Sequence, residues 1–483
     1  MSSSFRYATT SECDLKRRAR TRFTVLVLYA AAASAGLATA AAQDMELRLT
    51  VVTPMTLMDS AVVTIRGGHI AAVTAGAGGA NAIPIDGVMF PGLIDIHNHL
   101  TWNVLPNWRP PRLYTNRYEW QDTPEYALRL SGPYSAMMAA GAGCDMNRFG
   151  EVKSIVNGGT TTVGSFGPTP AEPARNRCIQ GLARNADYSA DLNPAMPLNQ
   201  EPYRNFVFPF ELSPSDEKLV RTADPDSADP QRIHAAVVHL AEGTDSAARR
   251  EFRMFRAHGY IRKGVTIIHG VALAPEDIRE LARGGVGLVW SPHSNFNLYG
   301  KTTDILTAMD AGMTVAIAPD WSPTGSAGML EELGIAYRYS LGALNGAIPA
   351  SRLVQMATIN PARLARLDAQ LGSIEPGKLA DVVVMRRQGK TAYEALLMGN
   401  PGDVLLVTIG GVPVYGDRAL MRRLLPNAPL EEIVVCGEAK ALHIVDDPSD
   451  ERSWQRVYDR LRRWMKPLGL APSALAACTA DER

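Results

Sequence analysis

The sequence predicts an α/β protein, in which a (β/α)8 barrel is accompanied by a small sheet domain built from both ends of the chain. Strand-like apolar runs alternate with amphipathic helical stretches through the middle of the 483 residues. Short clusters of strands flank this region on both sides. Polar residues recur at the ends of the middle strands, about 22 to 30 residues apart, as successive βα units require.

The order of these patterns divides the chain into five expected segments. They are an export leader at residues 1–42, a first part of the sheet domain at 43–89, the barrel at 90–370, a second part of the sheet domain at 371–440, and a helical tail at 441–483. A barrel of this length is usual for one domain.

The first 42 residues are typical of a signal peptide. A basic stretch at 16–22 precedes the uncharged residues 23–42, and the small residues Ala38 and Ala40 suit signal-peptidase cleavage. We therefore expect an exported protein, periplasmic or secreted, without stable membrane association after cleavage. An uncleaved membrane anchor is the alternative, because the uncharged run is nearly long enough to cross a bilayer.

Charge and cysteine content exclude some functions. Beyond the leader the chain carries 43 basic and 47 acidic residues, a net charge of −4, which argues against nucleic acid as a partner. Four cysteines follow the leader, which itself contains Cys13. In an oxidising compartment they allow three pairings, which the sequence does not distinguish, and unpaired thiols are the alternative. They are Cys144, Cys178, Cys436 and Cys478.

The flanking segments contain alternating strands. Residues 46–53, 61–66 and 69–73 alternate apolar and polar side chains, with a Gly67–Gly68 turn between the last two. This unit is too short to bury a core alone. The strand-rich residues 372–385 and 404–415 at the far end are its expected partner, which gives one composite domain.

The barrel strands end in polar residues. Strands are expected at 160–163, near 184–187, and at 235–240, 265–269, 287–291 and 313–320. The helix at 245–258 places Ala248, Phe252 and Phe255 on one face, and Pro275 opens the next helix. Since the active site of such a barrel lies at the carboxyl ends of its strands, we expect the polar strand-end residues to meet there.

The strongest motif is the apolar run at residues 90–100, which contains two histidines one residue apart. If this run is a strand, His97 and His99 project to one side and Asn98 to the other. His239 and Asp320 end two other strands. Three imidazoles and a carboxylate are suitable ligands for zinc or another first-row divalent ion, so the sequence predicts a metal site.

These residues also carry a resemblance. The chain resembles the metal-dependent amidohydrolase superfamily, and most closely its aminohydrolase and deaminase branch, from about residue 47 to residue 415. The matching motifs are FPGLIDIHNH at 90–99, GGTTTV at 158–163, HLAE at 239–242, IHG at 268–270, SPHSNFNL at 291–298, PD at 319–320, ATINPA at 357–362 and GKLAD at 377–381. The resemblance implies a distorted (β/α)8 barrel with a small β-sandwich.

The resemblance also implies roles for residues. His97, His99, His239 and Asp320 would bind one metal, with zinc expected and iron as the alternative, and Glu242 and His269 would be further catalytic residues. Members with two metals usually bridge them with a lysine at the end of the fourth strand. No convincing lysine lies between residues 205 and 212, which favours one ion.

The chemistry expected from this ligand set is hydrolysis by a metal-activated water, whose pKa falls to about 7. Asp320 would bind the metal and help orient or deprotonate the water, and Glu242 would carry the proton to the leaving nitrogen. His269 would polarise the substituent on the scissile carbon and stabilise the tetrahedral intermediate. The alternatives are an exposed turn role for Glu242 and a structural role for His269.

Two segments are candidates for the substrate pocket. The long connection after His99 could place Trp102, Trp108 and one or more of its arginines over the site, which would favour an aromatic or anionic small molecule. Those arginines are Arg109, Arg112 and Arg117. His293, Asn295 and Asn297 could also reach the substrate. Solvated arginines and loop-capping asparagines are the alternatives.

The sequence therefore predicts a metal-dependent hydrolase of carbon–nitrogen bonds other than peptide bonds. Glu242 favours deamination of a cyclic amidine, whereas export favours an amide, carbamate or lactam hydrolase. A non-catalytic barrel that binds metal and ligand is a third interpretation. In the tail, Trp454, Val457, Leu461 and Trp464 fall on one helical face, which is expected to dock on the barrel, with a homodimer contact as the alternative.

Overall fold

A computed structural model describes residues 44–76, 78–79, 81–164, 182–187, 203–206, 214–227 and 233–478. All of them belong to one unit of the chain, Ala40–Arg483. The predicted leader, with Cys13, lies outside the described residues, as does Cys178. Within the described ranges no helix combines the length and the apolar character needed to cross a membrane.

The barrel consists of eight strands in two arcs. One arc pairs β5, β6 and β7, the other pairs β8 to β12 in sequence order, and every pair is parallel. A parallel bridge between Asn98 and Asp320 joins the two arcs beyond the ends of β5 and β12. The strands are β5 (Leu93–Ile94), β6 (Gly159–Thr162), β7 (Arg184–Asn185), β8 (Tyr203–Phe206), β9 (Ala235–Leu240), β10 (Val265–His269), β11 (Gly287–Trp290) and β12 (Val315–Ile317).

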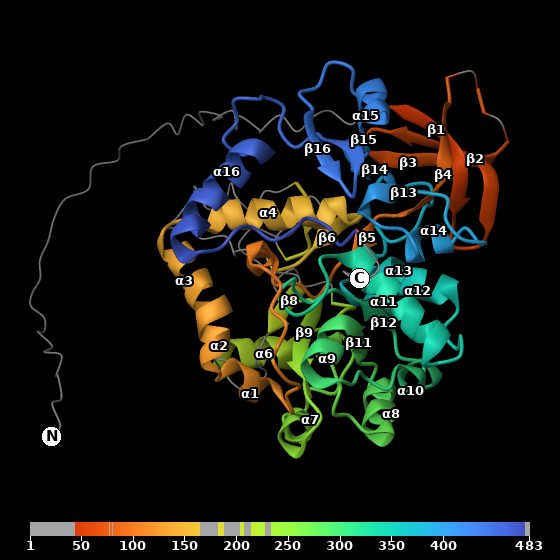
Figure 1. The fold of residues 1–483 in the computed structure, drawn as a ribbon. Coiled ribbons are helices and arrows are strands. Elements are labelled where there is room, and N and C mark those ends of the chain that lie inside the picture. The colour runs from red at the N-terminus through yellow and green to blue at the C-terminus, as the bar shows by residue number, and fades with distance from the viewer. Residues whose placement is uncertain are drawn as a thin grey trace, which may run out of the picture. The chain divides into compact units, whose positions relative to one another are not determined.

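Helices surround the barrel strands (Figure 1). In α7 (Ser246–Ala257) the side chains of Ala248, Phe252 and Phe255 are buried as expected, and the Asp245 carboxylate caps the first turn. The other helices of the barrel region are α4 (Gly143–Val156), α6 (Pro214–Thr222), α8 (Pro275–Arg283), α9 (Pro292–Tyr299), α10 (Ile305–Asp310), α11 (Met329–Gly342), α12 (Ala350–Ala357) and α13 (Ile359–Leu364).

The long connection between β5 and α4 is mostly helical. It contains the 3₁₀ helix η1 (Leu100–Val104), α1 (Arg117–Gln121), α2 (Pro124–Tyr126), the π-helical turn η2 (Ala127–Ser131) and α3 (Gly132–Ala139). Three backbone hydrogen bonds attach it to segments that follow other barrel strands: Trp108 N–H to Pro323, Tyr114 N–H to Leu298 of α9, and Arg117 N–H to Glu242. We call this connection, residues 100–139, the roof. Its hydrogen bonds hold it at the carboxyl ends of the barrel strands.

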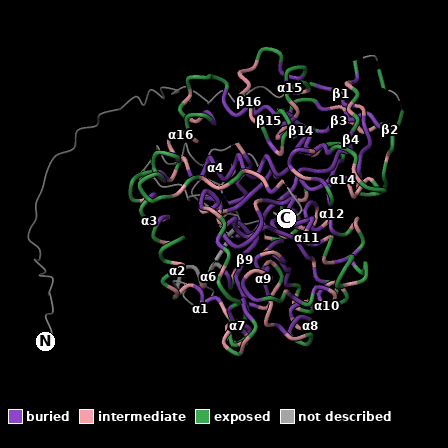
Figure 2. The backbone as a smooth tube through the Cα atoms, viewed as in Figure 1, coloured by how far each residue is buried: buried purple, intermediate pink, exposed green. Residues whose placement is uncertain are grey.

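The second domain is a single nine-stranded sheet that draws strands from both chain ends, in the order β16-β17-β15-β14-β13-β4-β1-β2-β3. Its buried face contains Leu47, Val63, Met89 and Val384. The strands are β1 (Met45–Val52), β2 (Leu57–Arg66), β3 (His69–Ala75), β4 (Ile83–Pro91), β13 (Val382–Arg386), β14 (Val404–Ile409), β15 (Val412–Asp417), β16 (Glu431–Val435) and β17 (Glu438–Leu442). Short helices connect them: α14 (Glu394–Leu397), η3 (Pro401–Asp403) and α15 (Arg418–Leu424). Figure 2 shows that buried residues concentrate inside both domains.

The sequence suggested that the apolar run at residues 90–100 is one strand, but in the structure it is divided between two sheets. Its first two residues end β4 of the large sheet, and Leu93–Ile94 form β5 of the barrel. Gly92 is the crossing point, where a Cβ atom would lie only 2.2 Å from the Thr160 hydroxyl oxygen. His97 and His99 therefore follow the strand, and the period-two argument for their common direction does not apply.

A buried ion pair ties the barrel to the large sheet. Arg184, at the start of β7, donates to Asp381 through Nε at 2.6 Å and Nη2 at 3.0 Å. Asp381 also accepts the backbone N–H of Gly410. Both side chains are almost fully buried, so neither charge can turn to solvent if its partner is lost.

We expect Arg184→Met to lower the free energy of unfolding by about 3–5 kcal/mol, because it leaves the Asp381 carboxylate buried without its cation. Denaturant titration followed by circular dichroism measures this loss. The double variant Arg184→Met/Asp381→Leu is the control and should recover much of the stability. An equally unstable double variant would show that packing, rather than charge, explains the loss.

The tail helix α16 (Trp454–Met465) packs on barrel helix α4, where Trp454 stacks near Phe149 and Arg460 pairs with Asp145. Trp454, Val457 and Leu461 are buried as expected, but Trp464 is exposed and Met465 is buried in its place. The reason is geometric, since Met465 lies three full turns after Trp454. The short helix η4 (Lys466–Leu468) follows.

Two of the cysteine positions left open by the sequence are joined in the structure. Cys436, in the turn between β16 and β17, forms a disulfide with Cys478, near the end of the described chain. Cys144 is also disulfide-bonded.

Candidate metal centre and active site

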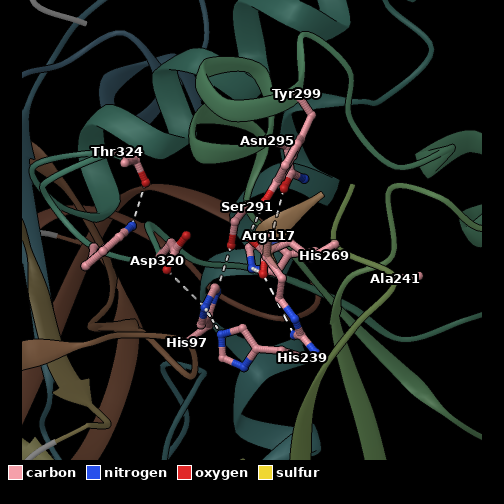
Figure 3. Close-up of polar contacts among 12 residues, drawn as sticks. His97, Arg117, His239, Ala241, His269, Ser291, Asn295, Tyr299, Asp320 and Thr324 are labelled. Carbon is pink, nitrogen blue, oxygen red and sulfur yellow. Dashed lines mark hydrogen bonds and ion pairs between the residues drawn. The ribbon is translucent and has the colours of Figure 1, made fainter. Parts of the chain in front are cut away.

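The four predicted metal ligands come from the ends of three different strands and fall in two groups of close ligand atoms that share His97, one with His239 and His269 and one with His99 and Asp320. Figure 3 shows His97 between His239 and Asp320. The Nε2 atoms of His97 and His239 lie 3.1 Å apart. Asp320 Oδ1 lies 3.2 Å from His97 Nε2 and 3.5 Å from His99 Nε2. His97, His239 and Asp320 are buried, whereas the side chain of His99 is 24 % exposed and faces the open side.

Each of these three spacings fits a pair of ligands on one divalent cation, although His239 and Asp320 belong to different groups of close ligand atoms. Tetrahedral coordination with bonds of about 2.0–2.1 Å separates neighbouring ligand atoms by about 3.3 Å. The three distances scatter around this value. Burial and the neighbouring histidines hold the pKa of both His97 and His239 well below its usual range, so these imidazoles are neutral, the form that binds a metal.

Ser291 fixes the orientation of His97. Its hydroxyl lies 2.9 Å from His97 Nδ1, which leaves Nε2 directed at the cluster (Figure 3). Ser291 directly follows β11. The residue after β11 thus positions a predicted ligand that follows β5.

The backbone at the site adopts left-handed conformations at residues other than glycine. Ala241, His269 and Asp320 have φ values of 53°, 66° and 67°. Each left-handed conformation destabilises the folded state by about 1–3 kcal/mol, and contacts of the surrounding structure must offset this free energy. These residues follow or end β9, β10 and β12, so the strain lies where the strand ends turn side chains toward the centre.

His269 lies beside the ligands. Its side-chain nitrogens come within 4.8 Å of the ligand atoms of His97 and His239. The Nδ1 atom lies 2.9 Å from the Asn295 side-chain oxygen, so Nδ1 carries the proton and donates it. The Asn295 amide also bonds to Thr302. Burial lowers the pKa of His269 to about 4, and the neutral ring therefore presents an unprotonated Nε2.

Glu242 faces His269 from the end of β9. Its Oε2 lies 3.7 Å from His269 Nε2, and its Oε1 accepts a 2.7 Å hydrogen bond from the Tyr299 hydroxyl. Arg117, from the roof, approaches Oε2 to 4.0 Å and pairs with Glu251 at 3.0 Å. Burial raises the pKa of Glu242 to about 7, against the opposing effect of Arg117. Glu242 is therefore a buried group able to exchange a proton near neutral pH.

Aromatic rings lie beside the solvent-facing ligand. The ring of Trp321 lies 5.7 Å from that of His99 and 5.5 Å from that of Trp102, centroid to centroid. Trp102 in turn stacks on Tyr134 at 3.7 Å. Trp108 is buried in the roof and packs near Trp120. The predicted aromatic contribution of Trp102 thus has a place near His99.

The other residues predicted to reach the substrate are three residues of α9 and three arginines of the roof. Asn295 is buried behind His269, and Asn297 donates to the Thr324 carbonyl. His293 Nδ1 lies 2.9 Å from the Ser326 hydroxyl, and its pKa falls to about 4, mainly by burial and further through the charges of Arg338 and Arg109.

Arg109 itself is exposed. Arg112 pairs with Glu119 at the surface. Of the three roof arginines, Arg117 lies nearest to the predicted catalytic groups.

The sequence placed Ser291 among the polar strand-end residues but gave it no role, and Tyr299 was not predicted as a site residue. Tyr299 has no such signal, because it ends α9 and meets Glu242 only through the fold. The stretch searched for a bridging lysine, residues 205–212, lies mostly outside the described residues.

Comparison with known proteins gives the same family as the motifs. The model of the "Amidohydrolase family" matches residues 231–414. A 5-methylthioadenosine/S-adenosylhomocysteine deaminase of Desulforudis audaxviator is 34% identical over 34% of this chain and 40% of the relative. The deaminase of the same name from Teredinibacter turnerae is 24% identical over 72% of this chain and 83% of the relative.

A solved structure extends this likeness to the fold. The adenosine deaminase of Xanthomonas campestris, solved with bound zinc, superposes with a TM-score of 0.59 over 88% of this chain and 98% of its own, at 17% identity. The matched family model, the barrel topology and the two groups of close ligand atoms that share His97 agree. Residues 231–414 therefore carry the match to the amidohydrolase family, and the chain as a whole resembles the aminohydrolase and deaminase branch.

Proposed function

We propose that this protein is a metal-dependent aminohydrolase that removes an amino group from a small cyclic amidine as ammonia. The observation that carries the proposal is the buried carboxylate of Glu242, held beside His269 and adjacent to the four predicted ligands. A barrel that only binds metal and ligand would need no such proton-exchanging group.

We propose a single zinc ion held by His97, His99, His239 and Asp320. A divalent ion in this position supplies Lewis acidity that lowers the pKa of a bound water to about 7. The three imidazoles and one carboxylate suit zinc, and the zinc in the similar adenosine deaminase of Xanthomonas campestris supports this choice. Iron is the alternative.

The residues around the proposed ligands have separate roles in the reaction. Asp320 orients the attacking water, and Glu242 accepts a proton from it and delivers the proton to a nitrogen of the substrate. His269, neutral and unprotonated at Nε2, accepts a hydrogen bond from the water and so directs its attack. This orienting role replaces the polarising role expected from the sequence, because Asn295 holds the single proton of His269 on Nδ1.

The substrate is proposed to be a small aromatic heterocycle. Trp321 and Trp102 offer apolar ring faces next to His99, the ligand on the open side. The similarity to deaminases of Desulforudis audaxviator and Teredinibacter turnerae favours an amino-substituted ring. Hydrolysis of an amide, carbamate or lactam is the second candidate, favoured by the exported location.

We further propose that the protein is exported and matures in an oxidising compartment. The leader pattern at residues 1–42 supports this. The Cys436–Cys478 disulfide and the disulfide-bonded Cys144 support it independently, because structural disulfides are rare in reducing compartments.

A screen of aminated heterocycles and of amides, read out as ammonia release and product mass, tests the reaction. Deamination exchanges an amino group for oxygen in one product and releases ammonia. Hydrolysis of a lactam instead opens the ring to an amino acid, and hydrolysis of an N-substituted carbamate gives an alcohol, an amine and carbon dioxide, in both cases without free ammonia. Protein stripped with a chelator is the control. Turnover of the second set alone would replace the deaminase proposal by the amide one.

Tyr299→Phe is expected to shift the pH profile of kcat/KM. Glu242 must be ionised to accept a proton, so the rate should rise with pH through a value near 7. The Tyr299 hydroxyl stabilises the ionised form, so its removal should raise the pKa and move this limb to higher pH. Rates at substrate concentrations well below KM, between pH 5 and pH 9, measure the shift, and an unmoved limb would exclude Glu242 as its origin.

A further inference from the structure

Asn103 links two loops that carry predicted ligands. Its side-chain Nδ2 donates to Asn98 Oδ1 at 2.8 Å, and its Oδ1 accepts the backbone N–H of Ser322 at 2.8 Å. Asn98 stands between His97 and His99, and Ser322 lies two residues after Asp320. One buried carboxamide therefore spans segments that lie more than 200 residues apart in sequence.

The ligand loop itself depends on a continuation of this network. Asn98 donates to Asp95 Oδ2 at 2.5 Å, and Asp95 Oδ1 accepts the backbone N–H of His97 at 3.1 Å. The backbone N–H of His99 donates to the Asp320 carbonyl at 3.1 Å. These bonds set where the backbone of each ligand lies, because β5 ends at Ile94, before the first histidine.

Asn103 lies in η1, a short 3₁₀ helix whose N-terminal residue, His99, makes no side-chain cap. Helices of this kind have poor hydrogen-bond geometry and need support from other segments. That support comes from the C-terminal segment 471–478. Ser473 donates its N–H to the Val104 carbonyl at 2.9 Å and its hydroxyl to the Asn103 carbonyl at 2.6 Å.

The C-terminal segment is held at several points. Lys153 of α4 donates to the Ser473 hydroxyl at 2.8 Å, and Asn157 donates to the Leu475 carbonyl at 2.8 Å. Figure 1 shows that this last part of the chain runs along α4 after α16. The Cys436–Cys478 disulfide then ties its end to the large sheet.

We propose that Asn103 is a positioning residue of the metal centre, and that the disulfide-tied C-terminal segment supports it. Together they keep the His97–His99 loop and the Asp320 loop at the spacing that a metal ion needs. Metal affinity thus depends on a segment outside the barrel. The inference goes beyond the proposed reaction and rests only on the predicted ligand set.

Zinc titration of the metal-free full-length protein against a chelating indicator tests this role. Asn103→Ala should weaken zinc binding by about 10- to 100-fold, as loss of an outer partner of metal ligands typically does. Asn360→Ala is the matched control, because Asn360 bonds only to the Val315 carbonyl at the far end of β12. Equal losses in the two variants would overturn the positioning role.

The support by the tail is tested with Cys436→Ser/Cys478→Ser and with Ser473→Ala. Each should weaken zinc binding by a few-fold, and combining the cysteine pair with Asn103→Ala should add less than the separate losses predict, since the tail acts through Asn103. Fully additive losses would overturn the coupling. If Asn103→Ala does not fold, wild-type affinity in both tail variants would overturn the proposal.

Different results would contradict the role of Asn103 and the proposed reaction. A wild-type protein that binds no zinc contradicts the ligand set itself, and with it both proposals. A wild-type protein that binds zinc but releases no ammonia from any compound contradicts only the reaction. Tight zinc binding in every variant contradicts only the role of Asn103 and the tail.

Discussion

Glu242→Gln is expected to lower kcat by about 10²- to 10⁴-fold while leaving the metal content and the fold unchanged. The amide has the shape of the carboxyl group and can still accept the hydrogen bond of Tyr299, but it cannot accept a proton from water. Steady-state ammonia release, together with metal analysis of the same preparation, measures both quantities.

Glu332→Gln is a matched control for this variant. Glu332 is also buried, and burial raises its pKa to about 8, so near pH 7 it is largely protonated and an amide replaces it with little change. Its activity should stay close to that of the wild type. Full activity in Glu242→Gln would instead remove the proton-transfer role and revive the interpretation as a binding barrel.

His239→Ala should abolish activity and weaken metal binding by more than about 10³-fold, beyond the 10- to 100-fold typical of an outer partner. His239 contributes a buried neutral nitrogen 3.1 Å from that of His97, and no other described side chain within reach of the cluster replaces it except His269. Zinc competition titration and mass-spectrometric metal analysis quantify the loss.

His234→Ala serves as the control, since His234 lies on the same stretch of chain just before β9 and outside the cluster. It should retain metal and activity. If His239→Ala kept its metal, then His269 would have to be a ligand, and the assignment of His269 as the residue that orients the water would be wrong.

The ligand positions could be predicted from the sequence because two constraints act together. His239 ends a buried strand, and Asp320 follows one, each visible as a short apolar run. A parallel barrel then forces such ends onto one face. The motif at residues 90–99 supplied the other two ligands, although the reason first given for their common direction was wrong, since the strand ends at Ile94.

The surroundings of Glu242 could not be predicted in the same way. Arg117 reaches it from a roof whose course is set by tertiary hydrogen bonds, such as that from the Arg117 N–H to the Glu242 carbonyl. Tyr299 is brought in by the end of α9. Neither contact has a period or a spacing in the sequence, because loop positions depend on the scaffold that anchors them.

The split of the run at residues 90–100 shows a related limit. The apolar pattern continues through Gly92 without interruption, because the residues on both sides are buried, first in the large sheet and then in the barrel. Hydrophobicity reports burial but not the sheet to which a residue belongs. In α16 the predicted buried face included Trp464, but Met465 lies three full turns after Trp454 and is the residue that is buried there.

Metal analysis of the purified mature protein, paired with ammonia release before and after chelation, tests the central claim most directly. We expect about one equivalent of zinc per chain, loss of activity on chelation, and recovery when zinc is restored. Two tightly bound equivalents would show a second metal and a missed bridging ligand. A protein that stays metal-free after loading, or that keeps its activity without metal, would contradict the account.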